Sequence, residues 1–384
     1  MIWFVFCVCF ALFMNTSLSS FLGVTSVTTF AFMPFTLLLL KEIFLKRIDL
    51  KNNKDELRIL ILAVCIIGFK FFIGQNYFKY VSTLLIIPML ISAYLATVSV
   101  AKLKVLKKIV ELFYIIECIM AIYEKFTQSL LLYNPIYGYL ESVKSVQSWN
   151  FRSGALLGHP LANAMVVAVI MTFVVIDKNI SKLKKYLLVS LGMLALLSFN
   201  SRGAIIVVCV FTLPYFMINE FKNQKPKNKA IVLLMLVALV STSVYFIINS
   251  SLGGRLAASD SLIDGSAQTR LDVYKFYTYL SDYDLWFGNQ ESYLYITKKL
   301  GAGGVENGII VYILNFGLLI APLLLVLLFK FQYKKLKIYP AKERWLILAV
   351  FYIIGIMNPN LAISVQWMVF VFAFFAYKEQ LIKS

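Results

Sequence analysis

The stretch RSGALLGHPLANA (152–164) contains the only histidine of the chain, His159, and opens with an arginine, Arg152. An imidazole beside a phosphate-binding arginine would suit acid–base chemistry on an anionic substrate. Pro160 follows the histidine, and proline is suited to the first turn of a helix. The stretch therefore predicts either a catalytic histidine with a substrate-binding arginine or the entrance of a helix.

Three further arginines, Arg202, Arg255 and Arg270, lie like Arg152 away from the lysine-rich segments. Arginine stays charged when it is partly desolvated, and its planar fork binds phosphate through two parallel hydrogen bonds. These arginines are therefore candidates for holding an anion. The alternative is a solvated loop charge or a lipid-headgroup contact, which we favour for Arg255 because it follows the glycine-containing stretch SSLGG.

Arg202 lies in the turn NSRG (200–203) between two apolar runs. The chain from Tyr186 to Phe221 allows only about 27 Å for each of two crossings, slightly less than the ~30 Å hydrocarbon core of a bilayer. We therefore expect the turn at or just beneath a membrane surface. Asn200 and Ser201 are candidate caps of the second helix, and an arginine at a helix N-terminus can bind phosphate.

Glu306 and Asn307 stand where the apolar run GIIVYILNFGLL begins. A carboxylate at this threshold is costly to bury unless it is paired or functional. It also gains from the macrodipole at a helix N-terminus, which would be a purely structural explanation. The sequence leaves both explanations open at this point.

Apolar segments must position these residues. The chain is 60% hydrophobic with a mean hydropathy of +0.81, against roughly 45–50% apolar residues in soluble domains. The recurring apolar runs predict one polytopic membrane domain over 1–384, with the first run a spanning helix instead of a signal peptide. The five cysteines all lie in apolar runs, so neither a disulfide framework nor a metal site is expected. The predicted spans are 3–22, 24–40, 57–73, 80–100, 109–126, 156–177, 186–200, 203–219, 230–249, 305–329, 345–357 and 361–377.

Lysine-rich segments set the predicted orientation. They fall on one side of the membrane if there are twelve spans with both termini in the cytoplasm, as the positive-inside rule requires. This explains most of the net charge of +18 without nucleic-acid binding. Two longer outer segments follow, 127–155 and 250–304. The lysine-rich segments are 41–58, 101–108, 177–185, 221–229, 330–344 and the C-terminal YKEQLIKS.

The long outer segment contains SAQTRLDVYKFYTYL, which predicts a helix capped by Ser266 or Thr269. Its expected apolar face could lie on the membrane. Arg270 in its first turn binds an anion or forms a surface ion pair with Asp272. LWFGNQ (285–290) is an aromatic turn suited to interfacial burial or to stacking on sugar rings. The expected face comprises Leu271, Tyr274, Tyr277 and Leu280, with Val273 and Phe276 adjoining.

Four motifs in order resemble the O-antigen polymerase and ligase family of bacterial envelope glycan assembly. They are Arg152 with GHPLA, then LSFNSRGA, then TR followed by LWFGNQ, then EN opening an apolar helix with GLL. The resemblance implies a GT-C-like all-helical fold and a metal-independent glycosyltransferase without a cofactor. Its substrate would be a glycan on undecaprenyl pyrophosphate at the outer face of the bacterial cytoplasmic membrane. The motif positions imply that Arg202 and Arg270 hold the pyrophosphate.

The ligase branch of that family has a histidine at the position of Glu306, so we favour a polymerase of repeat units for O-antigen or capsule. Arginines would stabilise the leaving pyrophosphate, and Glu306 would activate the acceptor hydroxyl. A ligase-type transferase and a lipid-linked oligosaccharide flippase are the alternatives. The lipid bilayer and a chain-length regulator are candidate partners. The expected substrate-binding residues are Arg152, His159, Asn200, Arg255 and Asn307.

Overall fold

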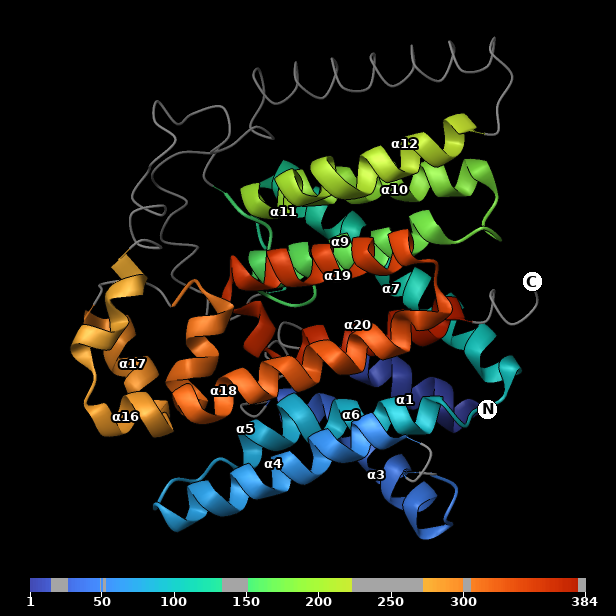
Figure 1. The fold of residues 1–384 in the computed structure, drawn as a ribbon. Helices are drawn as coiled ribbons and strands as arrows, with labels where there is room; N and C mark the ends of the chain where they lie inside the picture. Colours follow the sequence, from blue (N-terminus) through green and yellow to red (C-terminus); the bar gives the residue numbers. More distant parts are fainter. Residues whose placement is uncertain are drawn as a thin grey trace.

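The computed structural model describes residues 1–14, 27–48, 50, 53–132, 151–222, 272–299 and 305–378 (Figure 1). Within these ranges every regular element is a helix, so the predicted all-helical fold is confirmed there. The elements are α1 (Ile2–Phe13), α3 (Val27–Phe44), α4 (Lys54–Phe72), α5 (Phe78–Val81), η1 (Ser82–Ile86), α6 (Ile87–Leu95), α7 (Val100–Thr127), α9 (Pro160–Ile176), α10 (Lys182–Ser198), α11 (Arg202–Val207), η5 (Val208–Thr212), α12 (Leu213–Lys222), η6 (Val273–Tyr279), α16 (Asp282–Phe287), α17 (Gln290–Lys299), α18 (Gly308–Lys335), η7 (Leu336–Ile338), α19 (Ala341–Ile356), η8 (Pro359–Ala362) and α20 (Ser364–Lys378).

Three helical stretches among the described residues are long and apolar enough to cross a membrane, namely Phe78–Leu95, Arg202–Glu220 and Gly308–Ile338. They support membrane association. Each predicted span overlaps a helix, except 230–249, which lies outside the described residues. The first two stretches contain short π-helical segments, Ser82–Ile86 and Val208–Thr212, where the backbone widens within an otherwise continuous helix.

Several helices extend beyond the predicted spans into the lysine-rich segments. Helix α7 begins at Val100 and includes the whole of 101–108, and α10 begins at Lys182. Lysine is a good helix former, and its aliphatic stem can lie along an apolar surface while the ammonium group reaches water. These helices are therefore longer than the apolar spans that the sequence predicts.

The bundle has two distinct ends (Figure 1). We call the end with the turns after α3, α6, α9 and α18 the lysine end, and the opposite end, with the turns after α4, α10 and α19, the tip end. At the lysine end, four lysines form ion pairs with carboxylates of other helices. These lysines therefore also connect helices of the bundle. The pairs are Lys107–Asp177 (2.5 Å), Lys184–Glu111 (2.6 Å), Lys334–Asp55 (2.8 Å) and Lys335–Glu56 (2.5 Å).

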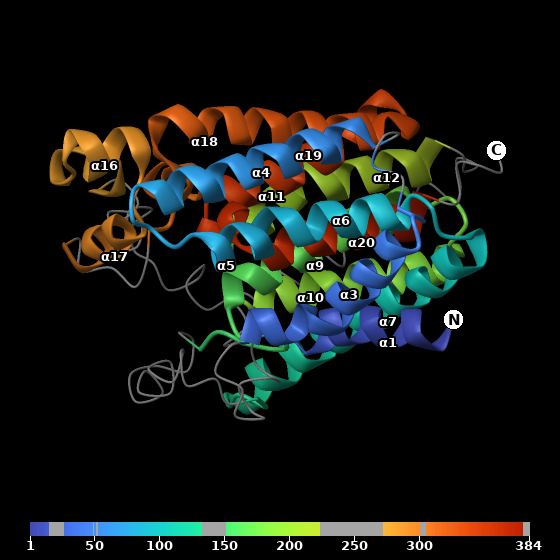
Figure 2. The same ribbon diagram turned by 90° about the horizontal axis from the view of Figure 1, so that it is seen from below.

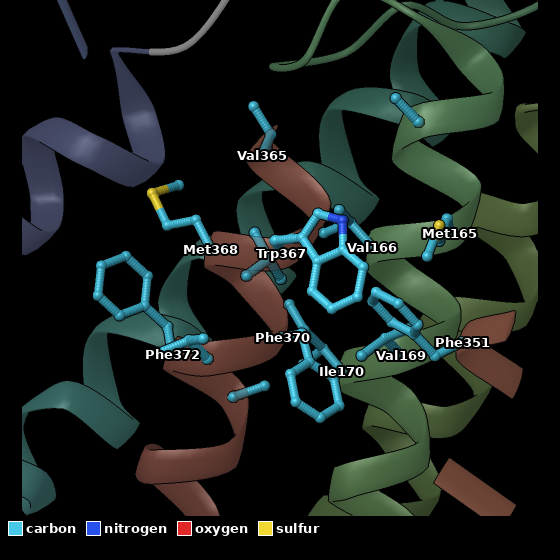
Figure 3. Packing of buried hydrophobic residues seen from close by; sticks show 14 of the residues in the cluster. Met165, Val166, Val169, Ile170, Phe351, Val365, Trp367, Met368, Phe370 and Phe372 are labelled. Carbon is cyan, nitrogen blue, oxygen red and sulfur yellow. The ribbon is translucent and has the colours of Figure 1, made fainter. Parts of the chain in front are cut away.

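Helices α9 and α20 run through the middle of the bundle (Figure 2). Every residue of α9 is buried, as is every residue of α20 up to Tyr377, which fits helices that are apolar on all sides. Trp367 packs edge-on against Phe351 with ring centroids 5.1 Å apart (Figure 3). Its indole Nε1 donates to the Leu361 carbonyl at 2.6 Å, so the ring is both packed and hydrogen-bonded.

Helix α18 is interrupted at Gly317, which has φ +76° and ψ 167°. The backbone of α16 and of the turn at Gly288 packs into this interruption, and a Cβ on Gly317 would overlap the Trp286 carbonyl oxygen. The Asn289 amide donates to the Leu314 carbonyl at 2.8 Å. The motif LWFGNQ thus docks through its main chain, whereas the Trp286 side chain is 48% exposed.

The described part of SAQTRLDVYKFYTYL differs from the prediction. Val273–Tyr279 forms a 3-10 helix, in which residues three apart lie on one face. Val273 and Phe276 are buried, whereas Tyr274 and Tyr277 are exposed, so the residues of the expected apolar face lie on two different sides of this 3-10 helix. Lys275 Nζ donates to Asp272 at 2.9 Å, and this hydrogen bond raises the pKa of Lys275. The preceding residues, including Ser266, Thr269, Arg270 and Leu271, lie outside the described residues.

Candidate active site at the tip end

The turn between α10 and α11 carries Arg202 as the first residue of the second helix, where its side chain is half-buried. Asn200 has φ +52°, a left-handed conformation that asparagine tolerates at the end of a helix. Its amide donates to the Leu197 carbonyl at 2.9 Å and closes α10. Asn200 thus terminates the first helix, and Ser201 precedes the second without a side-chain capping bond. The prediction that the Ser201 side chain caps α11 is wrong.

The segment before α9 lies along this turn. Arg152 Nε donates to the Phe199 carbonyl at 3.2 Å, and the Ser153 amide donates to the Ser198 carbonyl at 3.3 Å. The half-buried Arg152 is therefore anchored one residue before Asn200 on the hairpin. Arg152 is thus bonded to the main chain of the hairpin that carries Arg202 three residues after Phe199.

Two buried carboxylates of α7 accept hydrogen bonds from the segment that precedes α9. Glu124 Oε2 accepts hydrogen bonds from Ser153, Gly154 and Ala155, and Glu117 Oε2 accepts one from the Leu156 amide at 3.1 Å. Neither glutamate was among the predicted site residues. Both lie inside the predicted span 109–126, where a carboxylate is costly without a partner, and this signal in the sequence could have identified them.

His159 forms the N-cap of α9. Its Nδ1 accepts a hydrogen bond from the Ala162 amide at 3.4 Å, and its carbonyl accepts one from the Asn163 amide. The structure thus shows the helix-entrance role that the sequence left open. With Nδ1 as the acceptor, a neutral imidazole carries its proton on Nε2, which is then a donor only.

Asn307 forms the N-cap of α18. Its Oδ1 accepts hydrogen bonds from the amides of Ile309 (3.0 Å) and Ile310 (3.1 Å), and its Nδ2 donates to the Tyr274 hydroxyl at 3.1 Å. Glu306 immediately precedes this cap and is half-buried. These hydrogen bonds give the Asn307 side chain a structural role as a helix cap. The cap also fixes the main chain next to Glu306.

The turn that contains NPN (358–360) joins these elements. A Cβ on Gly203 would lie 3.1 Å from Met357 Sδ, and a Cβ on Gly308 would lie 3.0 Å from the Asn358 carbonyl oxygen. Asn360 Nδ2 donates to the Leu161 carbonyl at 2.8 Å. The turn therefore touches the start of α11, the start of α18 and the start of α9, a role that the sequence did not reveal.

The tip end thus gathers residues that the sequence singled out from three separate segments. Arg255 and Arg270 lie outside the described residues, as do 133–150, 250–271 and 300–304 of the two outer segments. Among the described side chains, no group of three or more His, Cys, Asp or Glu residues could hold a metal ion. The gathered residues are Arg152, His159, Asn200, Arg202, Glu306 and Asn307.

Comparison with protein families, with curated proteins and with solved structures finds no match to this chain.

Proposed function

We propose that the protein joins undecaprenyl-pyrophosphate-linked oligosaccharide repeat units into O-antigen or capsular polysaccharide at the outer face of the bacterial cytoplasmic membrane. One observation carries the proposal: Arg152 is anchored to the Phe199 carbonyl on the turn that presents Arg202. Two guanidinium groups at one turn are suited to a pyrophosphate, because each can bind phosphate oxygens through two parallel hydrogen bonds.

Breaking the glycosidic bond to the lipid leaves negative charge on the pyrophosphate. In this proposal Arg152 and Arg202 stabilise that charge as it develops, with Arg270 as a third cation and Arg255 at the rim. The turn is followed by a continuous helix from Arg202 to Glu220, and Ser201 makes no side-chain capping bond to it. The positive end of this helix adds to the attraction of an anion.

The acceptor sugar supplies the nucleophile. Glu306 takes the proton of its hydroxyl group while the oxygen forms the new bond to the anomeric carbon. The anomeric carbon–oxygen bond to the pyrophosphate breaks, and the bonding pair leaves with undecaprenyl pyrophosphate. His159 donates a hydrogen bond from Nε2 to the bound donor. This division of roles uses Glu306 where the resembling ligases have a histidine, which favours polymerisation.

The proposed placement is a GT-C-like bundle of twelve spans with both termini in the cytoplasm and the tip end outside. The lysine-rich turns within the described residues gather at the opposite end, which supports this orientation. Half-buried polar residues at the tip end would then lie near the depth of lipid headgroups, where the pyrophosphate of a lipid-linked donor resides.

The decisive experiment supplies the purified protein, reconstituted in liposomes, with undecaprenyl-pyrophosphate-linked repeat units. The products are separated by chain length. A ladder of glycans with two or more repeats, released together with undecaprenyl pyrophosphate, is the expected result. Single repeats that persist unchanged, or that only change leaflet, would contradict the proposal, and the second outcome would indicate a flippase.

A further inference from the structure

We infer that Glu124 is a positioning residue that holds Arg152 beside the α10–α11 turn. The importance of Arg152 for binding rests on the proposed function. The positioning of Arg152 by Glu124 rests on contacts between described residues and can be tested separately.

Glu124 uses both carboxylate oxygens. Oε2 accepts hydrogen bonds from Ser153 Oγ (2.6 Å) and from the amides of Gly154 and Ala155 (both 2.9 Å). Oε1 accepts one from the Leu131 amide at 2.9 Å. The side chain is fully buried. A single carboxylate thus contacts the chain near both ends of the outer segment 127–155.

The neighbouring residue of α7 fixes the other side of Arg152. Lys125 Nζ donates to the Phe151 carbonyl at 2.9 Å, and Lys125 is also fully buried. The residues directly before and after Arg152 are therefore both held by α7. With its backbone held in this way, Arg152 reaches the Phe199 carbonyl through Nε.

A carboxylate suits the position of Glu124 better than a neutral amide would. Its four bonding partners are all donors, and an ionised carboxylate is an acceptor on every lone pair. Glutamine would replace one oxygen with a donor group facing donors, so at least one buried amide would lose its partner. Glu111 offers a matched comparison, because it lies on the same helix and pairs with Lys184 at the lysine end.

The test compares Glu124→Gln with Glu111→Gln in the full-length protein in nanodiscs. Hydrogen exchange reports on the amides of residues 153–156. Binding of undecaprenyl pyrophosphate is titrated in parallel, with and without Arg152→Ala. We expect Glu124→Gln to speed exchange at 153–156 roughly tenfold and to weaken binding roughly tenfold, each corresponding to ~1.4 kcal/mol. Glu124→Gln should add no further loss of binding to Arg152→Ala, and Glu111→Gln should change neither quantity at the tip end.

Unchanged exchange at 153–156 in Glu124→Gln would overturn the inference, and so would an additive loss of binding in the double variant. If Glu124→Gln fails to fold, Ser153→Ala removes a single donor and should raise exchange at 154–155 by a smaller factor; unchanged exchange there would also overturn it. A wild-type protein that does not bind undecaprenyl pyrophosphate would overturn the proposed function, whereas the exchange rates alone still decide whether Glu124 holds the segment.

Discussion

Lys70 Nζ lies 2.7 Å from the carbonyl oxygen of Phe287, a residue 217 positions further along the chain. The same ammonium group donates to the Gly288 carbonyl at 2.5 Å and lies 4.4 Å from the centre of the Tyr77 ring. Lys70 is fully buried. A lysine of α4 therefore holds the end of α16 in the interruption of α18, and with it the described part of the long outer segment.

Replacing Lys70 with methionine keeps most of the volume and removes the charge. Two carbonyl groups would then lose a donor, so we expect Lys70→Met to lower the free energy of unfolding by about 2–4 kcal/mol. Thermal unfolding in detergent and the rate of proteolysis within 282–299 measure the effect. Lys79→Met, at an exposed position nearby, is the control, and equal melting temperatures for the two variants would refute the prediction.

Gly317→Ala should destabilise the same junction. Its φ of +76° is unfavourable for alanine, and the added Cβ would overlap the Trp286 carbonyl oxygen. We expect a loss of at least ~2 kcal/mol in thermal unfolding. Gly68→Ala is the matched control, because a Cβ at Gly68 has no atom within 4 Å. Inside a helix this control should be neutral or stabilise by roughly 0.5–1 kcal/mol, so a similar loss in both variants would argue against the docking contact.

Arg202→Ala should abolish long-chain glycan while the protein still accumulates in the membrane. Loss of a group that stabilises developing charge lowers the rate by roughly 10²–10³. Arg202→Lys should recover part of the activity, since it retains the charge but not the planar fork. Chain length is read by electrophoresis of glycan from complemented deletion cells. Arg58→Ala removes an exposed arginine at the lysine end; normal chain lengths in both alanine variants would exclude a role for Arg202.

Glu306→Gln should impair turnover more than donor binding, because the amide cannot accept the proton of the acceptor hydroxyl. We expect kcat to fall roughly 10²-fold or more with the donor KM changed less than about threefold. Glu291→Gln, an exposed carboxylate on α17, is the control. Unchanged turnover of Glu306→Gln with purified lipid-linked repeats would remove Glu306 from the mechanism.

The proposed orientation predicts which single cysteines react on intact cells. In a cysteine-free background, Leu131→Cys at the tip end should react with a membrane-impermeant maleimide, whereas Lys337→Cys at the lysine end should react only after permeabilisation. Both positions are exposed in the folded chain. The reverse pattern would invert the topology. The cysteines to be replaced by serine are Cys7, Cys9, Cys65, Cys118 and Cys209.

The sequence predicted the helices well because apolar runs report directly on burial and span length. It did not predict the interruption at Gly317, since a glycine within an apolar run is also compatible with a continuous helix. It also did not predict that Glu124 would hold the segment around Arg152, because that contact joins residues 29 to 31 positions apart in the sequence. Proximity of this kind depends on how helices pack, which a periodic pattern does not encode.

Some residues of the candidate site could likewise be recognised from the sequence, and others only from their contacts in the structure. Arg152 and Arg202 could be singled out because arginine is scarce and lies away from the lysine-rich segments. The turn at 358–360 carries no charge, and its importance arises only from its contacts with the starts of three helices. Asn307 was predicted as a substrate-binding residue, but its hydrogen bonds show a capping role that a sequence motif alone does not separate from binding.

Among the described residues, most side-chain hydrogen bonds between segments at the tip end join a side chain to a main-chain group. The acceptor is a main-chain carbonyl at Phe199, Leu161 and Leu361, and also at Phe151. Every amino acid provides such a carbonyl, so a substitution on the acceptor side leaves the joint intact as long as the backbone stays in place. Such a bundle can therefore accumulate many substitutions over evolutionary time while its few donor side chains preserve the arrangement.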